Sequence, residues 1–350
     1  MSGIHQFVPM LHRGDAVGRH TLRLRDVLVD RGIASRIYVE RADPHTESET
    51  RPYTAYAETA ERGDVLVYQF ATASALAPWL AARPEPLVVN YHNVTPPEPY
   101  AAWDNAMARH QLLAQTQLRR LATRCSLGIA VSAFNEAELR AAGFGRTAVV
   151  PPAAIVPIGA GTAPAPPGPF PRWLSVGRLA PNKGVEYAVM ALLVARTHHD
   201  PGTTLTVVGR PVVAPYTTAL HRFIDDMGLH DAVTFTGLLS DAELAATMAT
   251  TDVLVVTSQH EGFGVPVLEA MSLGIPVVSN RAGALPEVVG DGGLLVDATD
   301  PWALAGAVAR VVSDKGLRAA LAAAAARRVV DLDLASAGDR AIDLIAGLRA

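Results

Sequence analysis

The chain has 350 residues, 49% of them hydrophobic, and a formal net charge of −4 at neutral pH. This length predicts about two domains, each with enough apolar residues for a core of its own. The acidic balance argues against nucleic acid as a partner, and no apolar run is long enough to span a bilayer.

Residues 1–150 alternate short apolar strands with helical stretches. We expect strands at 4–9, 35–40, 64–70, 87–92 and 127–132, and helices at 21–32 and from about 100 to 123. Strands made almost entirely of Val, Ile and Leu are typical of parallel sheets covered on both faces. The first half therefore predicts an α/β, Rossmann-like, doubly wound domain.

The segment 151–171 interrupts this alternation. Eight of its 21 residues are proline and three are glycine, a composition that neither a helix nor a central strand tolerates. We predict an extended interdomain linker here.

The second half repeats the alternation, with expected strands at 172–178, 204–210, 232–237, 252–258 and 275–280. Residues 172–332 therefore predict a second Rossmann-like domain, followed by a helix in 333–350 for which packing back on the first domain is one option. Ligands of such sheets bind beyond the carboxyl ends of the strands, so we expect a site in a cleft between the two domains.

The stretch EGFGVPVLE holds two carboxylates around an apolar turn. Glu261 lies on the loop after a buried strand, and Pro266 is well placed as the first residue of a helix that carries Glu269 and runs to Leu273. Gly262 and Gly264 allow the main chain to approach a ligand closely. A helix start attracts a diphosphate, and carboxylates on either side suit neutral diols, so the pattern outlines a nucleotide-sugar.

The stretch GRLAPNKG, on the loop after the strand at 172–178, points to the same ligand. Arg178 and Lys183 combine a planar fork with a point charge for phosphate oxygens. Asn182 is the expected N-cap of the following helix.

Together, G-R-L-x-x-x-K-G and the E-G-F-G-x-P-x-x-E that follows about 77 residues later resemble the retaining GT-B glycosyltransferases of family four. The resemblance implies that Arg178 and Lys183 bind the donor diphosphate and stabilise the leaving group. It places Glu261 at the donor sugar and Glu269 at the ribose. It assigns sugar and phosphate contacts to Gly262, Phe263, Gly264 and Val265.

In such enzymes the amino-terminal domain binds the acceptor. The resemblance places His92, at the end of an apolar strand, near the donor sugar and the reacting centre, as a polar positioning group among the catalytic residues. Gly14 lies in a loop expected to approach phosphate or sugar, but Asp15 stands where the family has a second glycine, which leaves its contact open. Ser132 is either a cleft residue or a helix cap.

The implied reaction moves a hexose from a nucleoside diphosphate sugar, such as a UDP- or GDP-sugar, to a hydroxyl acceptor with retention, without a metal or other cofactor. Nucleotide base, sugar and acceptor stay open, with a base pocket expected near Arg210 and 236–238. The alternatives are a sugar phosphorylase, a nucleotide-sugar epimerase and a catalytically idle sugar-nucleotide binding protein.

A single cysteine, Cys125, and the lack of an apolar leader favour a cytoplasmic location. The helix at about 100–123 carries several arginines beside leucines. It is either an ordinary amphipathic helix or a peripheral contact with an anionic membrane.

Overall fold

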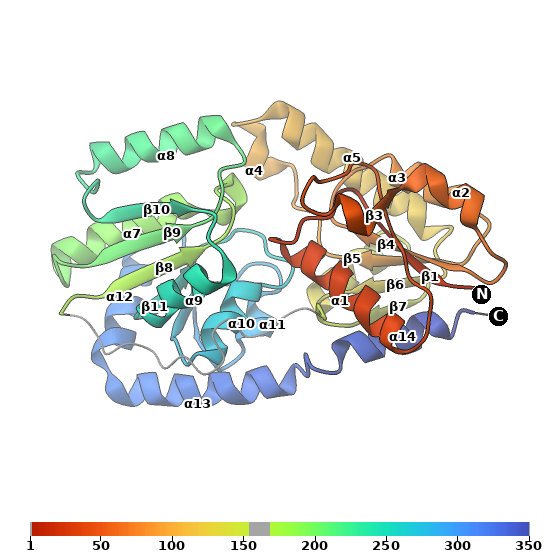
Figure 1. Ribbon diagram of the computed structural model, residues 1–350. Coiled ribbons are helices and arrows are strands. Elements are labelled where there is room, and N and C mark those ends of the chain that lie inside the picture. The colour runs from red at the N-terminus through yellow and green to blue at the C-terminus, as the bar shows by residue number, and fades with distance from the viewer. Residues whose placement is uncertain (1, 154–168, 350) are drawn as a thin grey trace. The chain divides into compact units, whose positions relative to one another are not determined.

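The computed structural model describes residues 2–153 and 169–349, so the predicted linker lies mostly outside the described residues (Figure 1). The chain divides into two units, which are described separately below. The first unit comprises 2–97, 106–153 and 333–349, and the second comprises 98–105 and 169–332. The short segment 98–105 therefore groups with the second unit, although the sequence analysis placed it in the first domain.

The first unit is built on a seven-stranded sheet in the order β3-β2-β1-β4-β5-β6-β7. All of its strand pairs are parallel. The order reverses between β1 and β4, which makes this the switch point at which such sheets bind ligands. Its elements are β1 (Ile4–Val8), α1 (Ala16–Asp30), β2 (Ile37–Val39), β3 (Thr50–Pro52), α2 (Tyr56–Thr59), β4 (Val65–Phe70), α3 (Leu76–Ala81), β5 (Leu87–Tyr91), α5 (Asn105–Ala122), β6 (Leu127–Ala130), α6 (Ala133–Ala141), β7 (Thr147–Val149) and α14 (Ala337–Ala346).

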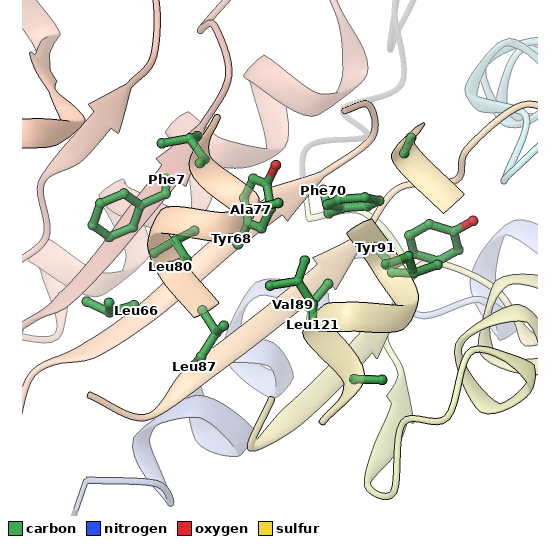
Figure 2. Packing of buried hydrophobic residues seen from close by; sticks show 14 of the residues in the cluster. Phe7, Leu66, Tyr68, Phe70, Ala77, Leu80, Leu87, Val89, Tyr91 and Leu121 are labelled. Atoms are coloured by element: carbon green, nitrogen blue, oxygen red, sulfur yellow. The ribbon is translucent and has the colours of Figure 1, made fainter. Parts of the chain in front are cut away.

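The core on one side of this sheet is rich in aromatic side chains (Figure 2). Phe7 stacks on Tyr38 with ring centroids 5.1 Å apart, and Tyr68 meets Phe70 edge to face at 5.2 Å. Leu66 and Leu87 are fully buried beside them. Such dense packing holds the strand ends, and the polar side chains on them, in fixed positions.

The other side of the first sheet is covered by α1 and the carboxyl-terminal helix α14, which lie side by side (Figure 1). Ile342 and Ile345 of α14 are fully buried in a cluster with Leu24 and Leu28 of α1. Arg31, the C-cap of α1, donates to Asp343 at 2.6 Å. Helix α14 thus completes the core of the first unit.

The second unit is built on a six-stranded parallel sheet in the order β10-β9-β8-β11-β12-β13, whose switch point lies between β8 and β11. The two sheets confirm the predicted α/β class. The elements are α4 (Glu98–Ala101), β8 (Arg172–Val176), the 3₁₀ turn η3 (Pro181–Lys183), α7 (Val185–His198), β9 (Thr204–Val208), α8 (Ala214–Asp226), β10 (Val233–Gly237), α9 (Asp241–Ala249), β11 (Val253–Val256), α10 (Val265–Ser272), β12 (Val277–Asn280), α11 (Leu285–Val289), β13 (Leu294–Val296), α12 (Pro301–Ser313) and α13 (Lys315–Asp331).

The prediction of one continuous helix in the first half was wrong. The helix expected from about 100 to 123 is broken into α4 and α5, and its two parts belong to different units. Asp104 stands directly before α5, where an aspartate favours the start of a new helix. The short edge strands β3, β7 and β13 were not predicted, because three-residue strands carry too little periodicity to be recognised.

No helix within the described part of the chain is both long and apolar enough to cross a membrane.

Candidate functional site

The loop after β8 carries both predicted cations of the second unit. Arg178 is exposed and Lys183 is half-buried in η3. Asn182 is not the N-cap that we predicted: it is buried, and its side-chain oxygen accepts from the Tyr100 hydroxyl at 3.1 Å. Gly184, with φ of +61°, is the N-cap of α7 instead.

Close approach of two main-chain segments sets the path of this loop. A Cβ on Gly209, after β9, would lie only 1.9 Å from the carbonyl oxygen of Gly177. Leu179 then donates its N–H to the carbonyl of Arg210 at 2.9 Å, and Gly209 donates to Gly237 at the end of β10. The segments that we associated with the nucleotide base therefore lie beside the loop that carries Arg178.

The loop after β11 is tied to the loop after β8, so these two loops meet at the switch point of the second sheet. The Lys183 Nζ lies 2.6 Å from Oε2 of Glu261, and the two side chains are 17% and 19% exposed. Ser258 Oγ lies 3.3 Å from the same oxygen. The main-chain N–H of Gln259 donates to the Asn182 carbonyl at 2.8 Å, and Thr257 Oγ1 donates to the Lys183 carbonyl at 2.9 Å.

The predicted helix after this loop is present as α10, with Pro266 as its second residue and the left-handed Gly264, at φ of +93°, as its N-cap. Glu269 lies in α10 and is only 2% exposed. Gly262 and Phe263 are buried between Glu261 and the helix start, while Val265 is half-buried. The structure thus gathers the predicted residues of the second unit around the switch point, except that Glu269 is buried rather than open.

Gly283, on the loop after β12, was missed by the sequence analysis. It has φ of +57°, and a Cβ here would lie 2.2 Å from the Glu261 carbonyl oxygen. The next residue, Ala284, donates its N–H to that same oxygen at 2.9 Å. A glycine shortly after a buried strand, in the stretch RAGALP, was the available signal.

The predicted residues of the first unit lie at the carboxyl edge of its own sheet. His92 follows β5, donates its main-chain N–H to Phe70, and places Nε2 2.7 Å from Oε1 of Gln69. Its ring meets His20 of α1 edge to face at 5.0 Å. Burial, together with the neighbouring His20, lowers the pKa of His92 well below its usual value, so this imidazole is neutral at physiological pH.

Asp15 and Gly18, at the start of α1, have structural roles that explain why these residue types stand there. Asp15 is the N-cap of α1 and accepts from the Gly18 N–H at 2.7 Å, so one of its carboxylate oxygens is committed to the helix start. Gly14 is exposed. At position 18, in contrast, a glycine is required, because a Cβ there would lie 1.7 Å from the His12 carbonyl oxygen. Ser132 is the N-cap of α6, which was one of its two predicted roles.

A second cluster beside His92 escaped the sequence analysis. Asn93 has a left-handed φ of +91°, and its amide donates to Asn135 at 2.8 Å and to Glu138 at 3.3 Å. The Tyr91 hydroxyl donates to Glu138 at 2.9 Å and accepts from the Val94 N–H at 3.1 Å. These bonds fix the turn in which His92 lies. Burial raises the pKa of Glu138 to about 7.

These buried groups predict how stability depends on pH. Burial lowers the pKa of His20 from 6.5 to about 4, so stability is lost as the pH falls through that window, by roughly 3 kcal/mol in full. Glu138 has the opposite sign: its pKa rises from 4.5 to about 7, so stability is lost as the pH rises through that range. Burial raises the pKa of Glu186 as well, so this group has the same sign as Glu138. Because the pKa values of His5 and His92 are lowered like that of His20, three histidines oppose two glutamates, and we expect a net loss on acidification from pH 6.5 to 4.5.

Urea unfolding at pH 4.5, 5.5, 6.5 and 8 measures this balance. Glu138→Gln should make the acid loss steeper, because it removes one of the opposing groups, and His20→Asn should make it shallower. Equal slopes for the wild type and both variants would show that these groups are not buried as described.

Within the described residues, no group of three or more His, Cys, Asp or Glu side chains is arranged to hold a metal ion.

Comparisons with known proteins show which proteins this chain resembles. Residues 164–328 match the family model described as Glycosyl transferases group 1. A GDP-mannose-dependent alpha-(1-6)-phosphatidylinositol monomannoside mannosyltransferase of Mycolicibacterium smegmatis is 34% identical over 192 residues, which are 52% of this chain and 49% of the relative. A D-inositol 3-phosphate glycosyltransferase of Acidothermus cellulolyticus is 40% identical over 155 residues, 42% of this chain and 34% of the relative. The chain spans about half, or less, of the length of these relatives.

Solved structures share the fold over nearly the whole chain. Anabaena HepE in complex with UDP and glucose superimposes with a TM-score of 0.77 at 20% identity, covering 99% of this chain and 100% of that one. A sucrose-phosphate synthase from Thermosynechococcus elongatus gives 0.77 at 21% identity with the same coverage. The chain thus has the GT-B fold, and its residues 164–328 match the glycosyl transferases group 1 family model.

Proposed function

We propose that this chain transfers a hexosyl group from a nucleoside diphosphate sugar to a hydroxyl acceptor, with retention at the anomeric carbon. The observation that carries the proposal is the contact of Lys183 with Glu261 beside the start of α10, at the switch point of the second sheet, with Arg178 exposed on the same loop as Lys183. The family match over 164–328 supports it, because that match covers these same residues.

In the proposed donor site, the cationic groups bind the diphosphate and the carboxylates bind the hydroxyl groups. The Lys183 ammonium has three N–H groups, of which one meets Glu261, so two are available for phosphate oxygens. The Arg178 guanidinium is exposed and adds a fork of donors. The start of α10 contributes its positive end to the same diphosphate. Glu261 holds the sugar hydroxyls and Glu269 the ribose diol, as acceptors of charge-assisted hydrogen bonds.

The proposed step is a front-face displacement. The bond between the anomeric carbon and the diphosphate oxygen breaks, and the bond to the acceptor oxygen forms on the same face of the ring. The acceptor proton passes to the leaving diphosphate, whose growing charge Arg178 and Lys183 stabilise. These two cations take the place of a metal ion, so the proposal needs neither a metal nor another cofactor.

The acceptor is proposed only as a class. One relative acts on a phosphatidylinositol mannoside and another is named for D-inositol 3-phosphate, so a polar hydroxyl carried by a soluble polyol phosphate or by a lipid head group fits both. Helix α5 exposes Leu112 and Leu113 beside Arg109, a surface suited to an anionic membrane. In this proposal the chain works in the cytoplasm, with peripheral contact through α5.

A two-stage assay tests the function. Thermal unfolding with UDP-, GDP-, ADP- and dTDP-hexoses identifies the donor, since a ligand at 100 times its Kd stabilises by about 2.7 kcal/mol. The stabilising donor is then incubated with inositol phosphates, free sugars, and vesicles with or without phosphatidylinositol. We expect release of the nucleoside diphosphate together with a new glycoside, and only when an acceptor is present.

Other outcomes identify the rival functions. Phosphate-dependent release of a sugar phosphate would indicate a phosphorylase, and an isomerised donor without any acceptor would indicate an epimerase. Tight donor binding with no turnover on any acceptor would favour a binding protein and contradict the proposal.

A further inference from the structure

Two buried glutamines lie next to His92 in the first unit. Gln6 in β1 and Gln69 in β4 are both fully buried on strands that are mostly apolar. These strands flank the switch point of the first sheet, and β5, which leads to His92, is the next strand along. Burying a primary amide is unfavourable unless its hydrogen bonds are made, so the partners of these side chains carry information.

The two amides form a continuous chain of hydrogen bonds. Nε2 of Gln6 donates to the main-chain carbonyl of Thr21 at 2.9 Å. Nε2 of Gln69 donates to Oε1 of Gln6 at 2.8 Å. Oε1 of Gln69 then lies 2.7 Å from Nε2 of His92.

Which group donates and which accepts at each of these hydrogen bonds follows from the main-chain carbonyl of Thr21 at one end of the series. A main-chain carbonyl can only accept, so Gln6 must present its NH₂ group to Thr21 and its oxygen to Gln69. Gln69 must therefore use its own NH₂ toward Gln6, which turns its oxygen toward His92. A bare oxygen can only accept, so Nε2 of His92 must carry the proton.

We propose that Gln6 and Gln69 are positioning residues that hold His92 in the Nε2–H tautomer and leave Nδ1 as a hydrogen-bond acceptor. The imidazole is neutral, because burial and His20 both lower the pKa of His92. No described residue forms a hydrogen bond with Nδ1 in the structure. A neutral His92 of this tautomer accepts a hydrogen bond from a hydroxyl and does not act as an acid.

This inference rests on the proposed function for its chemical meaning. A sugar donor and its acceptor both present hydroxyl groups, and a lone pair fixed on Nδ1 orients one of them. A histidine free to exchange tautomers presents an N–H group part of the time, which repels a hydroxyl proton. The hydrogen bonds of the two glutamines therefore determine which ring nitrogen of His92 accepts a hydrogen bond, and they leave its charge unchanged.

Nitrogen-15 NMR of the full chain with labelled histidine tests the tautomer directly, with His92→Asn to assign the signal. We expect His92 to show a protonated Nε2 and an unprotonated Nδ1 at pH 7. His20 is an internal reference in the same spectrum, because its Nδ1 accepts from the Ala153 N–H at 2.9 Å. A proton on Nδ1 of His92, or a charged ring at pH 7, would overturn the inference.

Variants of Gln69 test the cause. Gln69→Met keeps the volume but removes the acceptor, so His92 should show mixed tautomers and kcat/KM should fall roughly threefold to tenfold, the cost of one hydrogen bond. Gln69→Glu keeps an acceptor toward His92 but loses the bond it donates to Gln6, so it should keep the Nε2–H tautomer while raising the pKa of His92 and making kcat/KM fall at acid pH. An unchanged tautomer in Gln69→Met would refute the role of Gln69.

The failure of this inference can be told apart from failure of the proposed function. The tautomer is read without substrate, so it stands or falls by the spectrum alone. If His92→Asn keeps full transfer while the spectrum is as expected, the amide chain is correct but His92 has no part in the reaction.

Discussion

Replacing Lys183 by methionine should lower kcat/KM for transfer by about 100- to 1,000-fold, the effect of removing one preorganised charge from a transition state. Methionine keeps an unbranched apolar side chain against Gly177 and removes the ammonium group. The loss has two parts. The leaving diphosphate loses a cation, and Glu261 loses the partner that lies 2.6 Å away, so an uncompensated carboxylate then repels the phosphates.

Steady-state kinetics on the donor found by the binding screen measures this effect. The chain offers a matched control, since Lys315 is its only other lysine and lies exposed at the start of α13. Lys315→Met should leave kcat/KM unchanged. Activity of Lys183→Met within a factor of three of the wild type would contradict the assignment of this site.

Replacing Gly283 by alanine should lower kcat/KM by roughly 100-fold without touching a substrate. The new Cβ would lie 2.2 Å from the Glu261 carbonyl oxygen, so the peptide of Glu261 must move. A displacement of about 1 Å in a positioning group costs on this order. The hydrogen bond from Ala284 to the same carbonyl is lost with it.

Gly274→Ala is the control that separates displacement from backbone strain. Gly274 also has a left-handed φ, +68°, but a Cβ there meets nothing within 4 Å. Both variants should lose about 1 kcal/mol of stability from the strained φ, and Gly283→Ala should lose more, because the clash with Glu261 and the lost Ala284 hydrogen bond add to that strain; urea unfolding measures both losses. Of the two variants, only Gly283→Ala should lower kcat/KM. Equal kcat/KM values for the two variants would show that Gly283 does not position Glu261.

The sequence predicted the parts of the fold that are long and regular. The central strands of both sheets are confirmed, and α10 begins at Val265, one residue before the predicted start at Pro266, because continuous apolar runs and a proline near a helix start are local signals. The break between α4 and α5 was missed, because Asp104 alone is a weak signal for a new helix start and residues 98–105 pack within the second unit. That grouping depends on contacts such as Tyr100 with Asn182, which no local pattern reveals.

The candidate site was predicted as a set of residues but not as an arrangement. Arg178, Lys183, Glu261 and Glu269 were selected from two motifs, yet the contact of Lys183 with Glu261 joins residues 78 positions apart. The same limit applies to the amide chain behind His92. Glutamines on buried strands are visible in the sequence, but the direction of their hydrogen bonds depends on the main-chain carbonyl at its end.

A crystal structure of the chain with an intact nucleoside diphosphate hexose tests the central claim most directly. The account predicts diphosphate oxygens within hydrogen-bond distance of the Arg178 guanidinium and the Lys183 ammonium, with the ribose diol on Glu269. A nucleotide-sugar bound elsewhere on the chain, with both cations making no contact to it, would contradict the account.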